Sequence, residues 1–349
     1  MNSITLVGID LGKNTFHVHA QDRHGKMVLR KKFSRSQLLQ WLSSLPACTV
    51  AMEACGGAHY LARQLTGYGH RPRLIAAQFV RPFVKSNKND FIDAEAICEA
   101  ACRDAMRFVT PHTEAQQVLN ALHRVRESLV ADRVRTVNQI HAFLLEYGIS
   151  LPRGDKALTT LAATVESSPQ LASGMGEIVM ALHARLRNVE AELAVLDRKL
   201  ALLLASDEPG QRLQSIPGIG PITASLLRAR MGDGSQYPSA RAFAASLGLV
   251  PAQRSTGGRS TLLGISKRGD ARLRSLLVQC ARSWLQRLAR YQGPLAHWVR
   301  TLMQRRPGNT VACALANKLA RIAWAVVVKR TLFRIDMAST VEAASMAKA

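Results

Sequence analysis

Short apolar runs alternate with turn residues in the N-terminal part of the chain, a pattern typical of strands joined by hairpins. Residues 4–9 form a continuous apolar run, residues 16–20 alternate apolar and polar side chains, and residues 27–33 follow a turn at 22–25. The pattern therefore predicts three consecutive strands that pair through hairpins.

Helices then alternate with strands. Ser34 or Ser36 is a candidate N-cap for an amphipathic helix that Pro46 ends. The elements expected after it are a strand at 49–52 that leads into Glu53, a helix after Gly56 and Gly57, a strand at 74–77 and a helix that begins near Asp90. This order predicts a mixed α/β sheet with crossover helices.

Two long helical stretches follow, at 114–147 and at about 175–205. The second has apolar residues spaced alternately by four and three, the heptad pattern of a coiled-coil seam, at Leu182, Leu186, Val189, Leu193, Leu196, Leu200 and Leu203. The pattern indicates an antiparallel hairpin or an oligomerisation arm, and simple bundle packing is an equally open alternative.

After residue 207 the chain changes to Gly-rich turns and short, Arg-rich helices. We therefore expect an α/β domain at 1–110, coiled-coil helices at 111–207, a mainly helical domain at 208–335 and a tail at 336–349. A length of 349 residues, 47% of them hydrophobic, is enough for two or three ordinary cores and excludes a disordered chain.

Charge narrows the classes of function. Lys and Arg number 47 against 24 Asp and Glu, so the net charge of +23 predicts a polyanionic partner, with nucleic acid first among the candidates. The six cysteines form no CxxC pair, which indicates reduced, buried residues of a cytoplasmic protein. We expect no secretion leader and no membrane span, and the apolar run at 322–328 suits a core helix.

Four acidic residues stand at strand ends or in the first turn of the next helix. Asp10 ends the first strand, Glu53 ends the fourth, and Asp90 and Asp93 share a helix face. Because the carboxyl ends of neighbouring strands meet at one sheet edge, these carboxylates converge and need cations to offset their repulsion. We predict that all four are catalytic residues that bind one or two Mg²⁺ ions.

Each acid also has a plainer interpretation. Asp10 suits a turn, Asp90 suits a helix cap and Asp93 suits the first turn of a helix. His17 and His19 alternate along the second strand, and we interpret them as surface residues rather than metal ligands.

A glycine-rich turn is a second candidate site. The helix-hairpin-helix pattern fits Leu213, Ile216, Gly218, Ile219, Gly220 and Ala224. In that motif, backbone N–H groups, here those near Gly218 and Gly220, bind a phosphate without reading sequence. A turn used only for helix packing is the alternative.

The stretch from Pro251 to Arg306 carries twelve basic residues and one acid, Asp270, which gives +11 in 56 residues. A field of one sign that is interleaved with Trp284, Tyr291 and Trp298 predicts a nucleic-acid-binding track. The residues expected to contact nucleic acid are Gly218, Gly220, Arg254, Arg259, Lys267, Arg268, Arg272 and Arg274.

Ser255 lies within this track, in a polar loop flanked by Arg254 and Arg259. A serine in this position is able to attack a phosphodiester while guanidinium groups stabilise the developing charge. Composition alone favours the alternative, a polar turn that binds phosphate.

Taken in order along the chain, these motifs resemble insertion-sequence family 110, particularly its 1111 branch. The resemblance covers nearly the whole chain and rests on GIDLGK with Asp10, MEACGG with Glu53, NKNDFIDAEAI with Asp90 and Asp93, SIPGIGPITA, LGLVP, RSTGGRSTLLGISKRGDARLR and ANKLARIAWAVV. Members are DEDD transposases, which implies an RNase H/RuvC-like N-terminal domain, a coiled coil and a C-terminal transposase domain. The resemblance further implies that the protein recombines a circular element into target DNA, directed by a structured noncoding RNA that the element encodes.

The family is also known for a serine that joins covalently to DNA, and Ser255 is the closest match to it. Thr256 and Ser260 are near enough to leave the exact position open. We expect donor DNA, target DNA and the guide RNA as partners, a dimer or tetramer formed through the long helices, and a nucleoid-associated cytoplasmic location.

Two other classes of function remain as alternatives. GIDLGKNT also resembles the first phosphate loop of actin-like ATPases and sugar kinases, but a second phosphate loop and an adenosine motif are not found in the sequence. A structure-specific nuclease or a non-catalytic nucleic-acid-binding protein needs the basic region, and the nuclease needs the acids, but neither needs the serine.

Overall fold

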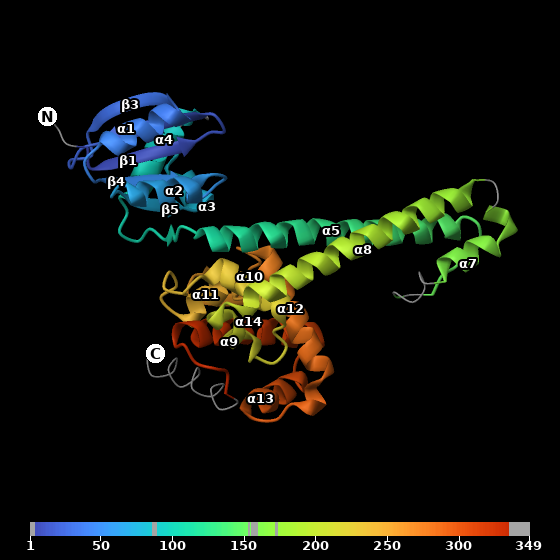
Figure 1. Cartoon of the computed structure of the whole chain (residues 1–349). Helices are drawn as coiled ribbons and strands as arrows, with labels where there is room; N and C mark the ends of the chain where they lie inside the picture. Colours follow the sequence, from blue (N-terminus) through green and yellow to red (C-terminus); the bar gives the residue numbers. More distant parts are fainter. Residues whose placement is uncertain (1–3, 86–88, 153, 155–159, 172–173, 335–349) are drawn as a thin grey trace. The chain divides into compact units, whose positions relative to one another are not determined.

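A computed structural model describes residues 4–85, 89–152, 154, 160–171 and 174–334 (Figure 1). The chain divides into two compact units, Met1–Ala115 and Gln116–Ala349. The first corresponds to the expected α/β domain. The second contains both the long helices and the region after residue 207, and the tail expected at 336–349 lies outside the described residues.

The N-terminal unit is built on one six-stranded sheet in the order β3-β2-β1-β4-β5-β6. β1, β4 and β5 are parallel, whereas β2, β3 and β6 pair antiparallel with their neighbours. The strands are β1 (Leu6–Leu11), β2 (Thr15–Gln21), β3 (Met27–Ser34), β4 (Thr49–Glu53), β5 (Arg71–Ile75) and β6 (Phe108–Val109). The mixed sheet is confirmed, although β5 lies at 71–75 rather than 74–77 and the sequence pattern missed β6.

The helices of this unit follow the expected order. A capping box starts the first of them, because Ser34 Oγ accepts from the Gln37 N–H while Gln37 Oε1 accepts from the Ser34 N–H. The helices are α1 (Arg35–Ser44), α2 (Ala58–Gly67), α3 (Ala77–Val80), the 3₁₀ turn η1 (Arg81–Phe83) and α4 (Asp90–Ala101).

Alternation along the strands gives the sheet two apolar faces. Val7, Ile9, Val50 and Met52 pack in one cluster with residues of α1 and α2. Ala51 packs in a separate cluster with residues of α4 on the other face. Because successive side chains of a strand point to opposite faces, every second residue of β1 and β4 points toward α4.

α4 lies so close to β1 that only glycine fits at position 8. A Cβ built on Gly8 would lie 2.4 Å from the Ala94 carbonyl oxygen and 2.7 Å from Cys98 Sγ. Cys98 Sγ also donates a hydrogen bond to the His19 carbonyl oxygen of β2 at 3.3 Å. These contacts fix α4 against both β1 and β2.

Gly8→Ala should therefore destabilise the N-terminal unit by about 1–3 kcal/mol, the usual cost of overpacking a core. Gly56→Ala is the matched control, because no described atom lies within 4 Å of the Cβ that it adds. Urea denaturation of the two variants measures the difference. Equal unfolding midpoints would contradict the close approach of α4 to β1.

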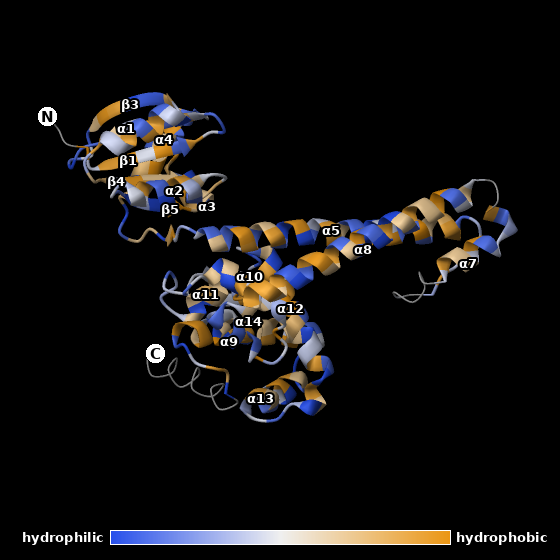
Figure 2. Ribbon diagram, in the orientation of Figure 1, coloured by the Kyte–Doolittle hydropathy of each residue, from blue (hydrophilic) through white to orange (hydrophobic). Residues whose placement is uncertain are grey.

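The C-terminal unit contains two long helices that pair antiparallel, α5 (Glu114–Leu145) and α8 (Met175–Ala205). Arg126 Nε lies 2.6 Å from Asp197 Oδ1, and Arg133 Nε lies 2.9 Å from Glu190 Oε1. The two ion pairs are seven residues apart on each helix, and the residue numbers rise along α5 as they fall along α8. This is the register of an antiparallel helix pair. Figure 2 shows hydrophobic and hydrophilic residues mixed along both helices.

Burial along α8 follows the heptad pattern only in part. Leu186, Val189 and Leu200 are buried as expected. At the C-terminal end Leu203 is 38% exposed and Leu204 is buried instead. A straight α-helix drifts relative to a strict heptad, which accounts for this exchange.

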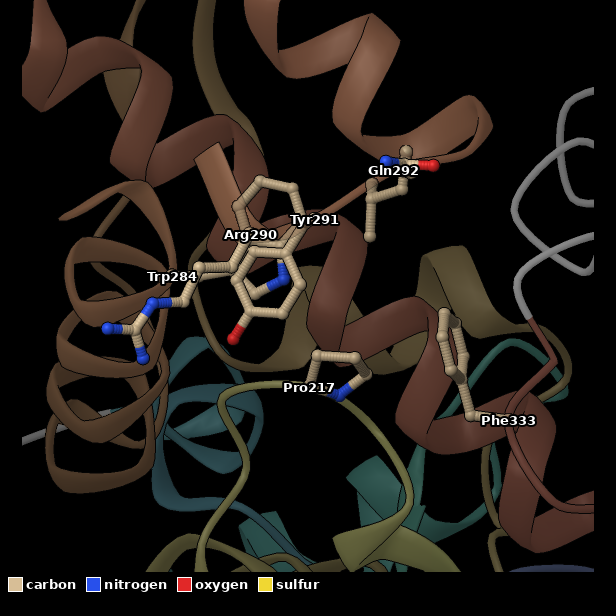
Figure 3. Close-up of a pocket in the computed structure, with 7 residues that line it drawn as sticks. Pro217, Trp284, Arg290, Tyr291, Gln292 and Phe333 are labelled. Atoms are coloured by element: carbon tan, nitrogen blue, oxygen red, sulfur yellow. The ribbon is translucent and has the colours of Figure 1, made fainter. Parts of the chain in front are cut away.

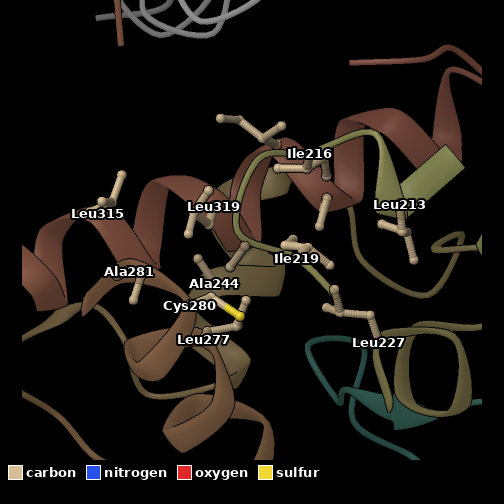
Figure 4. Packing of buried hydrophobic residues seen from close by; sticks show 14 of the residues in the cluster. Leu213, Ile216, Ile219, Leu227, Ala244, Leu277, Cys280, Ala281, Leu315 and Leu319 are labelled. Carbon is tan, nitrogen blue, oxygen red and sulfur yellow. The ribbon is translucent and has the colours of Figure 1, made fainter. Parts of the chain in front are cut away.

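Residues of α14 (Gly308–Val328) form the centre of the largest apolar cluster of this unit, and most of its shorter helices pack there. The helix at Leu161–Glu166 and the 3₁₀ turn at Pro169–Leu171 pack instead with the two long helices. Figure 4 shows part of this cluster, with Leu315 and Leu319 of α14 near Leu277 and Ala281 of α12. The helices are α7 (Leu161–Glu166), η2 (Pro169–Leu171), α9 (Glu208–Gln214), α10 (Pro221–Met231), α11 (Ala240–Ser246), α12 (Ala271–Gln286), η3 (Leu288–Arg290), α13 (Pro294–Met303) and α14 (Gly308–Val328).

α14 is also, within the described ranges, the one helix long and apolar enough to cross a membrane by length and composition alone. Two thirds of its apolar window, 67%, is buried inside the protein. That burial is the property of a core helix, as expected for the apolar run at 322–328.

The segment around Ser255 is a two-stranded ribbon rather than the expected loop. β7 (Pro251–Thr256) and β8 (Arg259–Ile265) pair antiparallel through a turn at Gly257 and Gly258, whose φ values are +57° and +77°. Positive φ at both central residues is the requirement of a two-residue hairpin turn, which glycine meets without strain. The ribbon is exposed along most of both strands.

Candidate functional site

Two of the four predicted acids point to the same face of the N-terminal sheet. Asp10 lies two residues after Gly8 on β1, and Glu53 lies two residues after Ala51 on β4. Gly8 and Ala51 both face α4, so the two-residue period of a strand places both carboxylates on that face, near the carboxyl ends of adjacent parallel strands.

The other two acids come from the first turn of α4. Asn89, not Asp90, is the N-cap, because its side chain accepts a hydrogen bond from the Phe91 N–H at 3.0 Å. Asp90 and Asp93 follow in the first turn. Asp90 is 55% exposed, so its carboxylate remains available to a ligand.

His17 joins this group, although the sequence interpretation treated it as a surface residue. β2 places His17 directly opposite Asp10 in the antiparallel ladder. His17 Nδ1 lies 3.5 Å from Asp90 Oδ2, and its ring packs edge-on against Phe91 with centroids 4.7 Å apart. One potential ligand atom each from Asp10, His17 and Asp90 lies within 4.8 Å of the others.

The electrostatics of the cluster favour a bound cation. Burial raises the pKa of Asp10, and the nearby carboxylates of Asp90, Asp93 and Glu53 raise it further. Burial, followed by the charge of Asp93, also raises the pKa of Glu53. These shifts mean that the ionised acids destabilise one another, and a divalent cation with oxygen ligands would offset that cost.

The glycine turn, residues 215–220, joins α9 to α10. Gly218 has φ +88° and is exposed, and a Cβ built on it would lie 3.2 Å from the Cys280 carbonyl oxygen. Gly220 is the N-cap of α10, and Pro221 follows at the first helical position. The turn is thus packed on α12 on one side, while Gly218 and Gly220 are both exposed.

The register of the ribbon separates Ser255 from its expected arginine partners. Ser255 is paired with Ser260, whereas Arg254 is paired with Thr261 and Thr256 with Arg259. Paired residues share a face and neighbours alternate, so Arg254, Thr256 and Arg259 lie on the face opposite Ser255. Ser255 Oγ instead accepts a hydrogen bond from Gln253 Nε2 at 2.7 Å.

The predicted basic contacts divide into two groups. Arg254, Arg259, Lys267 and Arg268 are exposed. Arg274 is half-buried, and its Nη1 donates to the Leu247 carbonyl oxygen at 2.9 Å.

Arg272 belongs to the interior of the C-terminal unit. Its guanidinium pairs with Glu127 of α5, and its side chain is only 21% exposed. It also lies near His123, whose pKa falls to about 4 because of burial first and the charge of Arg272 second. The structure therefore gives Arg272 a role in packing α12 against α5.

Comparisons with known proteins match segments of the chain to two transposase models. Residues 7–149 match the DEDD transposase model of the IS110 family, and residues 210–294 match a model described as "Transposase IS116/IS110/IS902 family". The first match contains all four acids, and the second contains the glycine turn and the ribbon.

Individual relatives align over almost their whole length. The chain is 57% identical over 333 residues to the transposase for insertion sequence element IS1328 of Yersinia enterocolitica, with 95% of this chain and 99% of the relative covered. It is 38% identical to the transposase for insertion sequence element IS1111A of Coxiella burnetii, with 96% and 92% covered. These relatives are transposases rather than ATPases or sugar kinases, and the chain belongs to the IS116/IS110/IS902 family of transposases.

Proposed function

We propose that this transposase cuts and rejoins DNA with two sets of groups, the four N-terminal acids, which hold Mg²⁺, and Ser255, which acts as the nucleophile. The observation that supports the proposal most directly is the cluster of Asp10, His17 and Asp90, whose potential ligand atoms lie within 4.8 Å of one another. Glu53 and Asp93 lie near enough to raise the pKa of Asp10. Burial and the neighbouring carboxylates raise the pKa of Asp10, so the ionised cluster costs stability unless a cation binds to it.

The donor set fits a hard divalent cation. Asp10, Asp90, Asp93 and Glu53 offer carboxylate oxygens, which Mg²⁺ prefers, and His17 offers a nitrogen beside Asp90. A divalent ion bound there stabilises the charge that develops on phosphodiester oxygens during strand cleavage. Phe91 packs edge-on against the His17 ring, and His17 Nδ1 lies 3.5 Å from Asp90 Oδ2. These contacts support a role for the imidazole in positioning the Asp90 carboxylate.

Ser255 carries the covalent step. Its Oγ bonds to the phosphorus of a DNA strand while the bond from phosphorus to one ester oxygen breaks, the serine proton passes to a base, and the departing strand end takes up a proton as a hydroxyl. The link from serine to the DNA phosphate is also a phosphodiester and replaces the link between two nucleotides, so attack by a strand hydroxyl in the reverse direction releases the serine and rejoins DNA. The hydrogen bond from Gln253 orients Oγ and leaves its own hydrogen for the base.

Phosphate contacts position the nucleic acid. The turn at Gly218 and Gly220, as a helix-hairpin-helix, offers backbone N–H groups, and the exposed Arg254, Arg259 and Arg268 offer positive charge. These contacts do not read sequence. Pairing with an element-encoded guide RNA selects the donor and target DNA.

The paired α5 and α8 helices form a coiled coil that joins copies of the chain into a dimer or tetramer. Apolar side chains exposed on these helices support this proposal, namely Val118, Val125, Val195 and Leu202. A cytoplasmic, nucleoid-associated location follows from the DNA substrate.

One observation favours a second candidate, a metal-dependent nuclease that forms no covalent intermediate. Arg254 and Arg259 lie on the ribbon face opposite Ser255, so they do not flank its hydroxyl as the nucleophile role predicts. A protein–DNA species that survives denaturing gel electrophoresis supports the recombinase. Cleavage without such a species supports the nuclease.

His17→Ala should lower the affinity for Mn²⁺, used as a substitute for Mg²⁺, by about tenfold, which is the usual effect of removing a group that orients a ligand. Isothermal titration calorimetry measures this change. His24→Ala is the matched control, because His24 is an exposed histidine in the turn after β2. Unchanged affinity in His17→Ala would remove His17 from the metal site.

Nucleic-acid affinity should fall steeply with salt, with a log–log slope on the order of minus several, because phosphate contacts release counterions. Arg268→Gln should reduce the size of the slope by about 1, as expected for one lost phosphate contact. Arg272→Gln should instead lower stability by about 1–3 kcal/mol, because it removes the charged hydrogen bond to Glu127 between α12 and α5. A slope that Arg268→Gln leaves unchanged would contradict the assignment.

A further inference from the structure

A pocket of about 290 Å³ lies beside the glycine turn in the C-terminal unit (Figure 3). It is formed by three segments that lie far apart in sequence: the turn itself, the stretch from the end of α12 to the start of α13, and the chain after α14. The residues that line it are Pro217, Trp284, Arg290, Tyr291, Gln292, Leu295 and Phe333.

Two stacked aromatic rings make one wall of the pocket rigid. Trp284 and Tyr291 have centroids 4.5 Å apart and planes only 5° from parallel. Trp284 is 2% exposed, so the indole anchors the stack in the core. Arg300 Nη2 donates to the Tyr291 carbonyl oxygen at 2.7 Å, which fixes the backbone that carries the tyrosine.

The polar groups of the pocket come from residues on either side of Tyr291 in the chain. Arg290 and Gln292 are both exposed, and they offer a guanidinium and an amide that both donates and accepts hydrogen bonds. None of the seven lining residues is acidic. We therefore expect a ligand with a flat apolar face, with hydrogen-bonding groups along its edge and without a positive charge that would need an acidic partner.

The size of the pocket limits the ligand further. Pockets for drug-sized ligands span about 300–1,000 Å³, so a pocket of about 290 Å³ lies just below that range and suits a small ligand. Proteins that bind single strands combine a positive surface with aromatic rings on which bases stack. Pro217 lines the pocket and is followed directly by Gly218 of the glycine turn. A nucleic-acid strand with a phosphate bound at the turn would therefore have a base beside the pocket.

We propose that this pocket binds one unpaired nucleobase, stacked on Tyr291 and contacted at its edge by Arg290 and Gln292. The inference rests on the proposed binding of a phosphate by the glycine turn and adds a base-binding site to it. DNA and RNA share the chemistry of the base, so the experiment includes both.

The test is fluorescence anisotropy of full-length protein with labelled single-stranded DNA, single-stranded RNA of the same sequence, and a blunt DNA duplex. Tyr291→Ala should weaken binding of at least one single strand about tenfold, the usual effect of losing one base–aromatic stack. Tyr291→Phe should keep wild-type affinity, because it keeps the ring. The duplex affinity and the salt slope should stay unchanged in both variants, since no phosphate contact is lost.

Two further variants keep the result decisive. Tyr60→Ala, which removes an exposed tyrosine from α2, is the matched control and should bind as the wild type does. Gln292→Ala should lower the affinity for the same single strand about fivefold, because it removes one hydrogen bond. This variant tests the base site if the melting curve shows that Tyr291→Ala is unfolded.

Loss confined to the DNA or to the RNA strand identifies the source of the base. Wild-type affinity of folded Tyr291→Ala and of Gln292→Ala for both single strands would overturn the base site while leaving phosphate binding intact. Equal loss on the duplex would overturn it as well. A wild-type protein that binds none of the three probes would instead remove the phosphate-binding proposal and this inference with it.

Discussion

Asp10→Asn is expected to reduce DNA strand cleavage about a thousandfold, which corresponds to about 4 kcal/mol of lost transition-state stabilisation. Asp10 is the central member of the cluster, because Asp90, Asp93 and Glu53 all raise its pKa and His17 is its cross-strand neighbour. An amide keeps the shape of the side chain but removes the charge that holds a divalent cation. Cleavage of a labelled element junction in Mg²⁺ measures the change.

The same variant should leave the fold intact and even stabilise the metal-free protein. Because the pKa of Asp10 is raised in the folded state, its contribution to stability is lost as the pH rises above the ordinary range of an aspartate, and at neutral pH its ionised form opposes folding. Asp10→Asn should thus melt at a higher temperature in EDTA and gain less from added Mg²⁺. Asp104→Asn, which changes an exposed acid of the same unit, should match the wild type, and wild-type cleavage by Asp10→Asn would refute the catalytic assignment.

Ser255→Ala is expected to abolish the covalent protein–DNA species completely while retaining affinity for DNA and RNA. The substitution removes the hydroxyl that forms the phosphoserine ester, and the exposed ribbon has no core for the change to disturb. Denaturing gel electrophoresis of a reaction with labelled DNA detects the species. Mass spectrometry of the digested product identifies the linked residue.

Thr256→Ala and Ser260→Ala are the matched controls for this experiment, because each removes one neighbouring hydroxyl from the ribbon. Both should retain the covalent species. A species that persists in Ser255→Ala and disappears in Thr256→Ala would transfer the role to Thr256, which shares its face with Arg254 and Arg259. Absence of any such species from the wild-type reaction would favour the nuclease.

The strands and the position of the acids were predictable because both depend on local patterns. A strand of period two fixes the face of each residue, so Asp10 and Glu53 follow from where β1 and β4 end. The start of α4 places Asp90 and Asp93 in one turn. β5 was harder to place, because Arg71, Pro72 and Arg73 do not resemble a strand even though they pair with β4.

His17 was missed because the interpretation weighed residue type without register. The signal was present in the length of the turn between the first two strands, since residues 12–14 connect β1 to β2 and bring His17 opposite Asp10. Register follows from turn length in a hairpin, so the pair was available from the sequence.

The ribbon shows the same limitation in the C-terminal unit. Gly257 and Gly258 between runs of β-branched and polar residues are a hairpin signal, yet composition led to the expectation of a loop. Arg272 and Arg274 differ from Arg268 only in their contacts with α5 and with the turn after α11, and these are long-range contacts. Counting charges along the chain does not separate an arginine that binds phosphate from one that pairs with an acid inside the fold.

The most direct test of the central claim maps where a divalent ion binds. Fe²⁺ is exchanged for Mg²⁺ in the intact protein, and ascorbate with hydrogen peroxide then generates hydroxyl radicals that cut the backbone next to the metal. Cuts should fall near Asp10, Glu53 and the first turn of α4, and they should disappear with excess Mg²⁺ and in Asp10→Asn. Cuts elsewhere in the chain, or the same cuts in Asp10→Asn, would contradict a metal site formed by the four acids.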